Sequence, residues 1–133
     1  LQRFRLPYLM RLAWDLSVTV HEMHGHALCV PYFEAAFERI LGLYGSLDEV
    51  RRHRMDLFGG IYNPRRISGT RLWSTHAWGV AVDLDPEGNA WGWRWPQEAS
   101  MPLAIVEIFE GLGAVAGARW ERKPDAMHFQ FAR

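Results

Sequence analysis

The sequence predicts a single α+β domain in which helices pack on a largely antiparallel sheet. The chain has 133 residues, of which 49% are hydrophobic, and this suits one domain with one core. Most helix-like segments precede most strand-like segments, instead of alternating with them as in parallel βαβ units. The strand-like segments also alternate apolar and polar residues, which is typical of antiparallel strands. We therefore expect residues 1–133 to form one domain.

Local signals mark the ends of several helices. Pro31 suits the first turn of a helix, and apolar residues follow it at helical spacing. Ser46 and Glu49 have the spacing of a capping box, in which each side chain bonds an amide of the first turn. The expected helices are Pro31–Tyr44, a short one after Ser46, Pro102–Glu110 and, as a further candidate, Leu9–Leu16.

Two segments have the period-two alternation of strands, Val80–Asp85 and His128–Phe131. Each has one apolar face. Asp83 lies on the other face of the first segment, and His128 lies on the other face of the second. If the two strands share one sheet, both side chains point into a common space. Weaker strand candidates are Leu16–His21 and Ile61–Gly69.

The composition argues against several classes of protein. Fifteen basic and fifteen acidic residues give a formal charge of zero, which disfavours a nucleic-acid-binding protein. The basic run Arg51–Arg54 is typical of a solvated helix face. No uncharged stretch is longer than 11 residues, so no membrane span is expected. Cys29 is the single cysteine, and it has no internal disulfide partner.

Two short motifs predict a hydrolytic metal site. His76 and Asp83 are seven residues apart, and Asp125 precedes His128 by three residues. Two imidazoles and one carboxylate are a suitable set of three zinc ligands, and they leave a fourth position for water. The spare carboxylate, Asp125, can take the proton of that water and return it to the leaving amine. Asp85 shares a strand face with Asp83 and is an alternative ligand.

The pattern S-x-H-x-x-G-x-A-x-D followed by D-x-M-H-F resembles the M15 peptidases, the zinc peptidases of bacterial cell walls and phage endolysins. The resemblance extends upstream to Arg65, which precedes an isoleucine and a glycine, and it includes Asn89 and Trp120. It covers the chain from Phe58 to the C-terminus. It implies the Hedgehog/DD-peptidase fold.

The resemblance also implies roles for individual residues. Asp125 would be the general base, and Arg65 would stabilise the oxyanion, although the adjacent Arg66 is an alternative for this role. Asp125 has a rival role as a carboxylate that only orients a ligand histidine. The implied zinc ligands are His76, Asp83 and His128, and the implied substrate-binding residues are Ser74, Trp78 and Trp120.

The expected activity is hydrolysis of an amide bond in peptidoglycan stem peptides, with L-alanyl-D-glutamate endopeptidase as the first choice. A D-alanyl-D-alanine carboxypeptidase is the alternative. A zinc-stabilised binding module without activity is the rival from another class, and the presence of Asp125 and Arg65 argues against it. We expect a monomer that acts outside the cytoplasm or is encoded by a phage.

Two further features have competing interpretations. The run His21–His26 does not match the H-E-x-x-H zinc motif, because position 25 is glycine. Its histidines are expected to cap or solvate the start of the first long helix. Trp91, Trp93 and Trp95 alternate in one loop, where they would either pack or stack on a glycan or peptide at the rim of the site.

Overall fold

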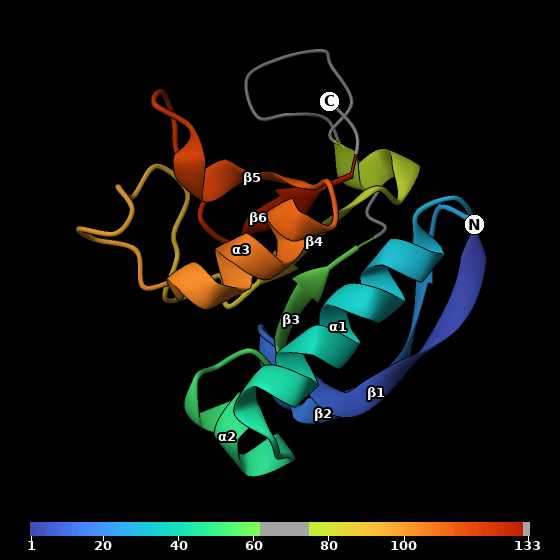
Figure 1. Cartoon of the computed structure of the whole chain (residues 1–133). Helices are drawn as coiled ribbons and strands as arrows, with labels where there is room; N and C mark the ends of the chain where they lie inside the picture. The colour runs from blue at the N-terminus through green and yellow to red at the C-terminus, as the bar shows by residue number, and fades with distance from the viewer. Residues whose placement is uncertain (62–74, 132–133) are drawn as a thin grey trace.

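A computed structural model describes residues 1–61 and 75–131 of the chain. Its centre is a six-stranded sheet in the order β2-β1-β3-β4-β6-β5, in which β1 and β3 are parallel and the other neighbours are antiparallel. The prediction of a mixed domain with a largely antiparallel sheet is confirmed (Figure 1). The strands are β1 (Gln2–Leu12), β2 (Asp15–Gly25), β3 (Leu57–Gly60), β4 (Ala81–Leu84), β5 (Val115–Ala116) and β6 (His128–Gln130).

The chain begins with a long antiparallel hairpin of β1 and β2. The helix expected at Leu9–Leu16 is therefore wrong, whereas the strand candidate Leu16–His21 lies within β2. In β1 every second side chain is buried, and those side chains line the core. This period of two, together with pairing to β2, outweighs the helix-like spacing of the apolar residues between positions 9 and 16. Two strands thus precede the helices, contrary to the predicted order.

The three α-helices are α1 (Val30–Tyr44), α2 (Leu47–Arg52) and α3 (Leu103–Gly111). Pro31 lies in the first turn of α1, and Gly45 ends this helix with a φ of 81°. The Ser46 side chain accepts a hydrogen bond from the Glu49 amide and so caps α2, as predicted. Among the described residues, none of the helices is long and apolar enough to cross a membrane.

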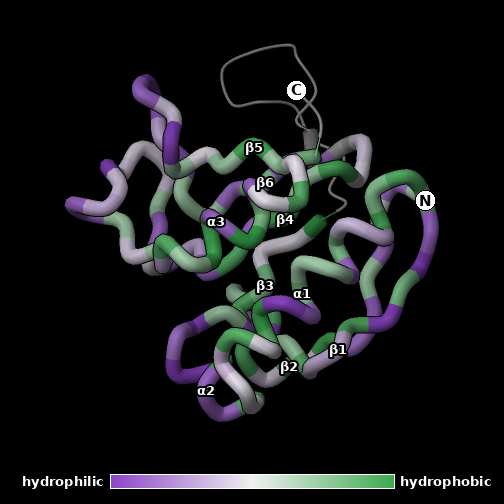
Figure 2. Tube along the Cα trace, viewed as in Figure 1, coloured by the Kyte–Doolittle hydropathy of each residue, from purple (hydrophilic) through white to green (hydrophobic). Residues whose placement is uncertain are grey.

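Helices α1 and α3 cover one face of the sheet, and the hydrophobic core lies between them and the strands (Figure 1). The trace is largely hydrophobic along β4 and β5, whereas hydrophilic residues predominate around α2 (Figure 2). Val82 of β4 and Phe129 of β6 are paired and fully buried in this core. The alternation along both strands therefore places Asp83 and His128 on the face opposite the core.

A tight turn connects the 3-10 helix η1 (Thr75–Trp78) to β4, and a second 3-10 helix, η2 (Gly117–Arg119), lies between β5 and β6. Gly79 forms the turn with a φ of 70°, and its carbonyl accepts a hydrogen bond of 2.8 Å from the His26 amide. A Cβ atom at Gly79 would lie 2.9 Å from that same amide nitrogen. The turn therefore requires glycine for both its dihedral angle and its close approach to the end of β2.

Two glycine substitutions should separate these requirements. Gly45→Ala introduces a side chain at positive φ with no atom within 4 Å of its Cβ, so it should lower the free energy of unfolding by about 1–2 kcal/mol. Gly79→Ala has the same dihedral cost plus the clash with the His26 amide, and it should cost distinctly more. Urea denaturation of both variants measures this difference, and equal losses would show that the close approach at Gly79 is unimportant.

Candidate metal centre

Asp83 and His128 come together because they are direct partners across β4 and β6. The Asp83 Oδ1 atom lies 3.2 Å from the His128 Nδ1 atom. Both residues are buried, with 8% and 6% of their surfaces exposed. The site therefore forms on the polar face of the same two strands that contribute Val82 and Phe129 to the core.

His76 reaches this pair from η1, on the other side of the Gly79 turn. Its Nε2 atom lies 3.1 Å from Asp83 Oδ1 and 3.2 Å from His128 Nδ1. Its side chain is almost completely buried, with 1% of the residue exposed. Three potential ligand atoms thus form a triangle with nearly equal sides.

The outer ring nitrogen of each histidine contacts an oxygen atom. His76 Nδ1 lies 2.9 Å from the carbonyl oxygen of Ile61, which can only accept, so this nitrogen carries a proton and donates it. His128 Nε2 lies 2.7 Å from the Oε1 atom of Gln130 and donates to it. In the neutral rings, the lone pairs of His76 Nε2 and His128 Nδ1 therefore both face Asp83.

This arrangement fits a metal ion. Two imidazole lone pairs and a carboxylate oxygen within 3.2 Å repel one another unless a positive charge lies among them. A tetrahedral zinc ion with bonds of about 2.0–2.1 Å separates its ligand atoms by about 3.3–3.4 Å, close to the spacing in this triangle. His76, Asp83 and His128 form the metal-capable cluster found among residues 1–61 and 75–131.

Without a metal ion, the cluster shifts the pKa values of its members. Burial raises the pKa of Asp83, but hydrogen bonds from His128 and His76 outweigh burial and hold it at about 2. Burial lowers the pKa of His128, but Asp83, together with Gln130 and Asp125, outweighs burial and raises the pKa above its usual value. Asp83 is therefore an anion throughout the physiological pH range.

Asp125 lies at the edge of the cluster. Its Oδ2 atom is 3.9 Å from His128 Nδ1, and 17% of its side chain is exposed. The loop that holds it packs on Gly117 of η2, whose carbonyl accepts a hydrogen bond from the Asp125 amide. A Cβ atom at Gly117 would collide with the carbonyl oxygen of Asp125. The position of the Asp125 carboxylate thus depends on glycine at residue 117.

The structure describes two of the three predicted substrate-binding residues, and it does not describe the third or the arginine predicted to stabilise the oxyanion. The Trp120 ring lies 5.5 Å from the His128 ring, and Trp78 in η1 is 58% exposed. Arg65 and Ser74 lie outside the described residues, as does Arg66, the alternative to Arg65.

Asp85 is not a ligand in this cluster. The strand ends at Leu84, and the backbone of Asp85 has a φ of 47°, so the alternation of β4 does not extend to it. Its carboxylate accepts hydrogen bonds from Arg54 and the Gly88 amide instead. The fully buried Asn89 donates to the Asp85 carbonyl and stabilises this turn.

The run His21–His26 gives a mixed result. His21 and His24 lie exposed on β2, away from the helix start that was predicted for them. His26 does cap the turn before α1, because its Nδ1 atom accepts a hydrogen bond of 3.2 Å from the Leu28 amide. In the described part of the chain, these residues form no metal-capable group.

The three alternating tryptophans divide into two kinds. Trp95 is packed, with its indole donating to the Met101 carbonyl at 2.6 Å and the Arg119 guanidinium 5.2 Å from its ring. Trp91 and Trp93 are 57% and 41% exposed. The packed interpretation thus holds for Trp95, and rim stacking stays a prediction for the other two.

Sequence reasoning missed the two groups that orient the histidines. Gln130 had a usable signal, because it follows His128 by two residues in a strand and so shares its face. The carbonyl of Ile61 had none, since a backbone acceptor 15 residues before His76 depends on how the chain packs.

A family model described as D-alanyl-D-alanine carboxypeptidase matches residues 68–131. The match includes all three residues of the cluster and Asp125, and it begins after Arg65. No curated protein and no solved structure has a significant match to the chain.

Loss of an orienting acceptor should weaken metal binding. Gln130→Leu removes the partner of His128 Nε2, and such changes around metal ligands typically cost about 10-fold to 100-fold in affinity. Competition with a chromophoric zinc chelator measures the affinity, and Gln130→Glu, which keeps an acceptor oxygen, is the matched variant. Equal affinities for Gln130→Leu and the parent chain would remove this role from Gln130.

Zinc affinity should also decrease as the pH is lowered. A metal ion needs the lone pair of His128, and the pKa of His128 in the metal-free chain is raised above its usual 6.5. Protons therefore compete with zinc for His128 at a higher pH than they would for an ordinary histidine. When the pH is lowered from 9, zinc affinity should start to decrease before pH 6.5 is reached. Zinc titrations between pH 5 and 9 measure this, and a decline confined to pH values below 6 would contradict it.

Proposed function

We propose that this chain, which belongs to the M15 peptidases through residues 68–131, is a zinc peptidase that hydrolyses an amide bond in peptidoglycan stem peptides. The observation that carries this proposal is the convergence of His76 Nε2, Asp83 Oδ1 and His128 Nδ1 within 3.2 Å, with the outer nitrogen of each ring held by an acceptor. Three protein ligands leave one position of a tetrahedral site for water, which distinguishes catalytic from structural zinc.

His76, Asp83 and His128 would hold the ion. Zinc held there would lower the pKa of water from about 15.7 to about 7 and polarise the scissile carbonyl. The acceptors on both histidines keep the rings in one tautomer and orientation. The polar face is thus organised before substrate arrives, which lowers the reorganisation that catalysis would otherwise require.

Asp125 is the proposed general base. Its Oδ2 atom, 3.9 Å from His128 Nδ1, is close enough to the ligand atoms to hydrogen bond a water molecule between them. It would accept a proton from the attacking water and transfer it to the amine nitrogen as the C–N bond breaks. The alternative role, orienting His128 alone, is less well supported because His128 already has Gln130 as its acceptor.

Other proposed roles follow from the family. Arg65 would donate two parallel N–H groups to the developing oxyanion, a task that suits a permanently charged guanidinium. Ser74, Trp78 and Trp120 are proposed to contact the substrate. Trp120 is supported by its position against the His128 ring, and Trp78 is supported by its exposure beside His76.

The type of bond has two candidates. The D-x-M-H-F ending favours an L-alanyl-D-glutamate endopeptidase, whereas the description of the matched family favours a D-alanyl-D-alanine carboxypeptidase. We further propose that the sheet, with its helices on one face and its metal ligands on the other, has the Hedgehog/DD-peptidase fold. A substrate in peptidoglycan implies action outside the cytoplasm or release by a phage.

Substitution of the base should abolish turnover without loss of zinc. Asp125→Asn keeps the shape of the side chain but removes its basicity, and kcat should fall about 100-fold to 10,000-fold. Glu121→Gln is the matched control, because it neutralises an exposed carboxylate on the same loop. Zinc content and mass spectrometry of defined muropeptides measure both properties, and the products distinguish the two bond types.

Each outcome has a clear meaning for the proposal. Full activity in Asp125→Asn would remove Asp125 from the mechanism. One zinc per chain with no cleavage of any stem peptide would favour the inactive binding module. Unchanged zinc content in His76→Ala would show that the ligand set is wrong.

A further inference from the structure

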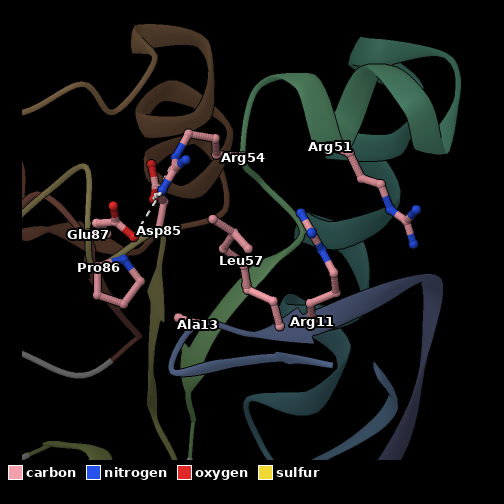
Figure 3. Close-up of a pocket in the computed structure, with 9 residues that line it drawn as sticks. Arg11, Ala13, Arg51, Arg54, Leu57, Asp85, Pro86 and Glu87 are labelled. Carbon is pink, nitrogen blue, oxygen red and sulfur yellow. Dashed lines mark hydrogen bonds and ion pairs between the residues drawn. The ribbon is translucent and has the colours of Figure 1, made fainter. Parts of the chain in front are cut away.

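A pocket of about 190 Å³ lies where β3 begins and β4 ends. It is lined by three arginines that the proposed mechanism does not use. Arg54 lies beside Asp85 and Glu87 on one side of Leu57, and Arg11 and Arg51 lie on the other (Figure 3). We call it the arginine pocket. Ala13, Leu16 and Pro86 complete its lining with apolar surface.

The arginine pocket opens on the same face of the sheet as the metal-capable cluster. Arg11 pairs with Leu57 in the parallel ladder of β1 and β3, whereas the next pair along, Leu12 and Phe58, contacts the core. Side chains of paired residues share a face, so Arg11 and Leu57 lie opposite the core, as Asp83 does.

A single glycine connects the two sites. A Cβ atom at Gly59 would lie 2.9 Å from the Cβ of Asp83 and 3.1 Å from the Cγ of Pro86, which lines the pocket. Both residues therefore pack against the bare backbone of Gly59. The cluster and the pocket are therefore separated by one residue of β3.

The three arginines are not held equally closely by the carboxylates around them. Arg11 binds the fully buried Asp56 through Nε at 2.6 Å and Nη2 at 3.3 Å, and Arg54 binds Asp85 through Nε and Nη2, each at 3.0 Å. Arg51 is left 3.7 Å from the Asp56 oxygen that Arg11 already holds. Two buried carboxylates thus face three guanidinium groups.

The third carboxylate of the pocket, that of Glu87, is on the side of Arg54 and not of Arg51. Glu87 lies 3.8 Å from Arg54, but 87% of its side chain is exposed, so water screens its charge. The side chain of Arg51 is 41% exposed, and its contact with Asp56 at 3.7 Å is longer than those of Arg11 and Arg54 with their carboxylates. The arginine pocket therefore presents a partly exposed, loosely paired guanidinium together with apolar surface.

We propose that the arginine pocket binds a carboxylate of the peptide substrate, with Arg51 as the principal donor. A guanidinium matches a carboxylate with two parallel hydrogen bonds, and Leu16 and Pro86 of the pocket lining suit the aliphatic atoms that carry it. This proposal rests on the proposed peptidase function, and it makes the pocket a determinant of which peptides bind.

Binding can be tested separately from catalysis. Backbone amides of the zinc-loaded chain are followed by NMR during titration with N-acetyl-D-glutamate and, in a second arm, with inorganic phosphate. We expect N-acetyl-D-glutamate to shift the amides of residues 54–57 and those of Asp85, Glu87 and Gly88. Shifts confined to the neighbours of His76 and His128 would overturn the proposal, as would phosphate binding in the pocket more tightly than the carboxylate.

Arg51 and Arg52 provide a matched pair of variants. Both lie on α2, but Arg52 is 74% exposed, is 3.7 Å from Glu49 and does not line the pocket. Arg51→Gln should weaken N-acetyl-D-glutamate binding about tenfold, which corresponds to about 1.4 kcal/mol, and Arg52→Gln should leave it unchanged. Equal effects of the two variants would indicate a bulk charge effect and overturn the proposal. Arg51→Lys keeps the positive charge but lacks the two parallel donors of a guanidinium, so this variant should bind N-acetyl-D-glutamate with intermediate affinity.

Catalysis gives an independent readout on stem peptides with a free or an amidated carboxylate. Arg51→Gln should raise KM about tenfold for the free acid, with kcat unchanged, and should have no effect on the amide. A change in kcat alone, or the same change for both peptides, would contradict the proposal. If no peptide is cleaved, the peptidase function fails while the NMR titration still decides whether the pocket binds carboxylates.

Discussion

The direct pairing of Asp83 with His128 across β4 and β6 is the contact on which the rest of the site depends. The same ladder pairs Val82 with Phe129, and Phe129 stacks on Phe109 of α3 with ring centroids 4.2 Å apart. A slip of one residue would turn these apolar side chains away from the core. Burial of the hydrophobic face therefore fixes the positions of Asp83 and His128 on the polar face, to which η1 adds His76.

This arrangement buries charged and polar groups, and removing such groups from water costs free energy. A buried carboxylate and two imidazoles are costly unless each finds a partner, and the fold supplies partners through the Ile61 carbonyl and Gln130. The face opposite the helices also holds the arginine pocket, in which buried carboxylates are paired in the same way. Because α1 and α3 cover only one face of the sheet, both polar features are brought to the other face.

Local sequence signals predicted helix starts correctly, because they act within one helical turn. Pro31 and Ser46 marked helix starts correctly, because proline geometry and side-chain capping involve neighbouring residues. The interpretation of Leu9–Leu16 as a helix failed because its apolar spacing fits both a helix and an amphipathic strand. Pairing with β2 and the parallel contact of β1 with β3 decided between them, and neither is visible in a short window.

The sequence by itself indicated which groups could form the metal centre, because strand alternation predicts the face of Asp83 and of His128, and the motif spacing adds His76. It also excluded a highly charged binding protein. Only the tertiary structure decided that Asp85 binds Arg54 instead of joining the cluster, and that the Ile61 carbonyl orients His76. These contacts join segments that are distant in the chain or depend on the end of a strand, so their geometry is set by packing and not by local spacing.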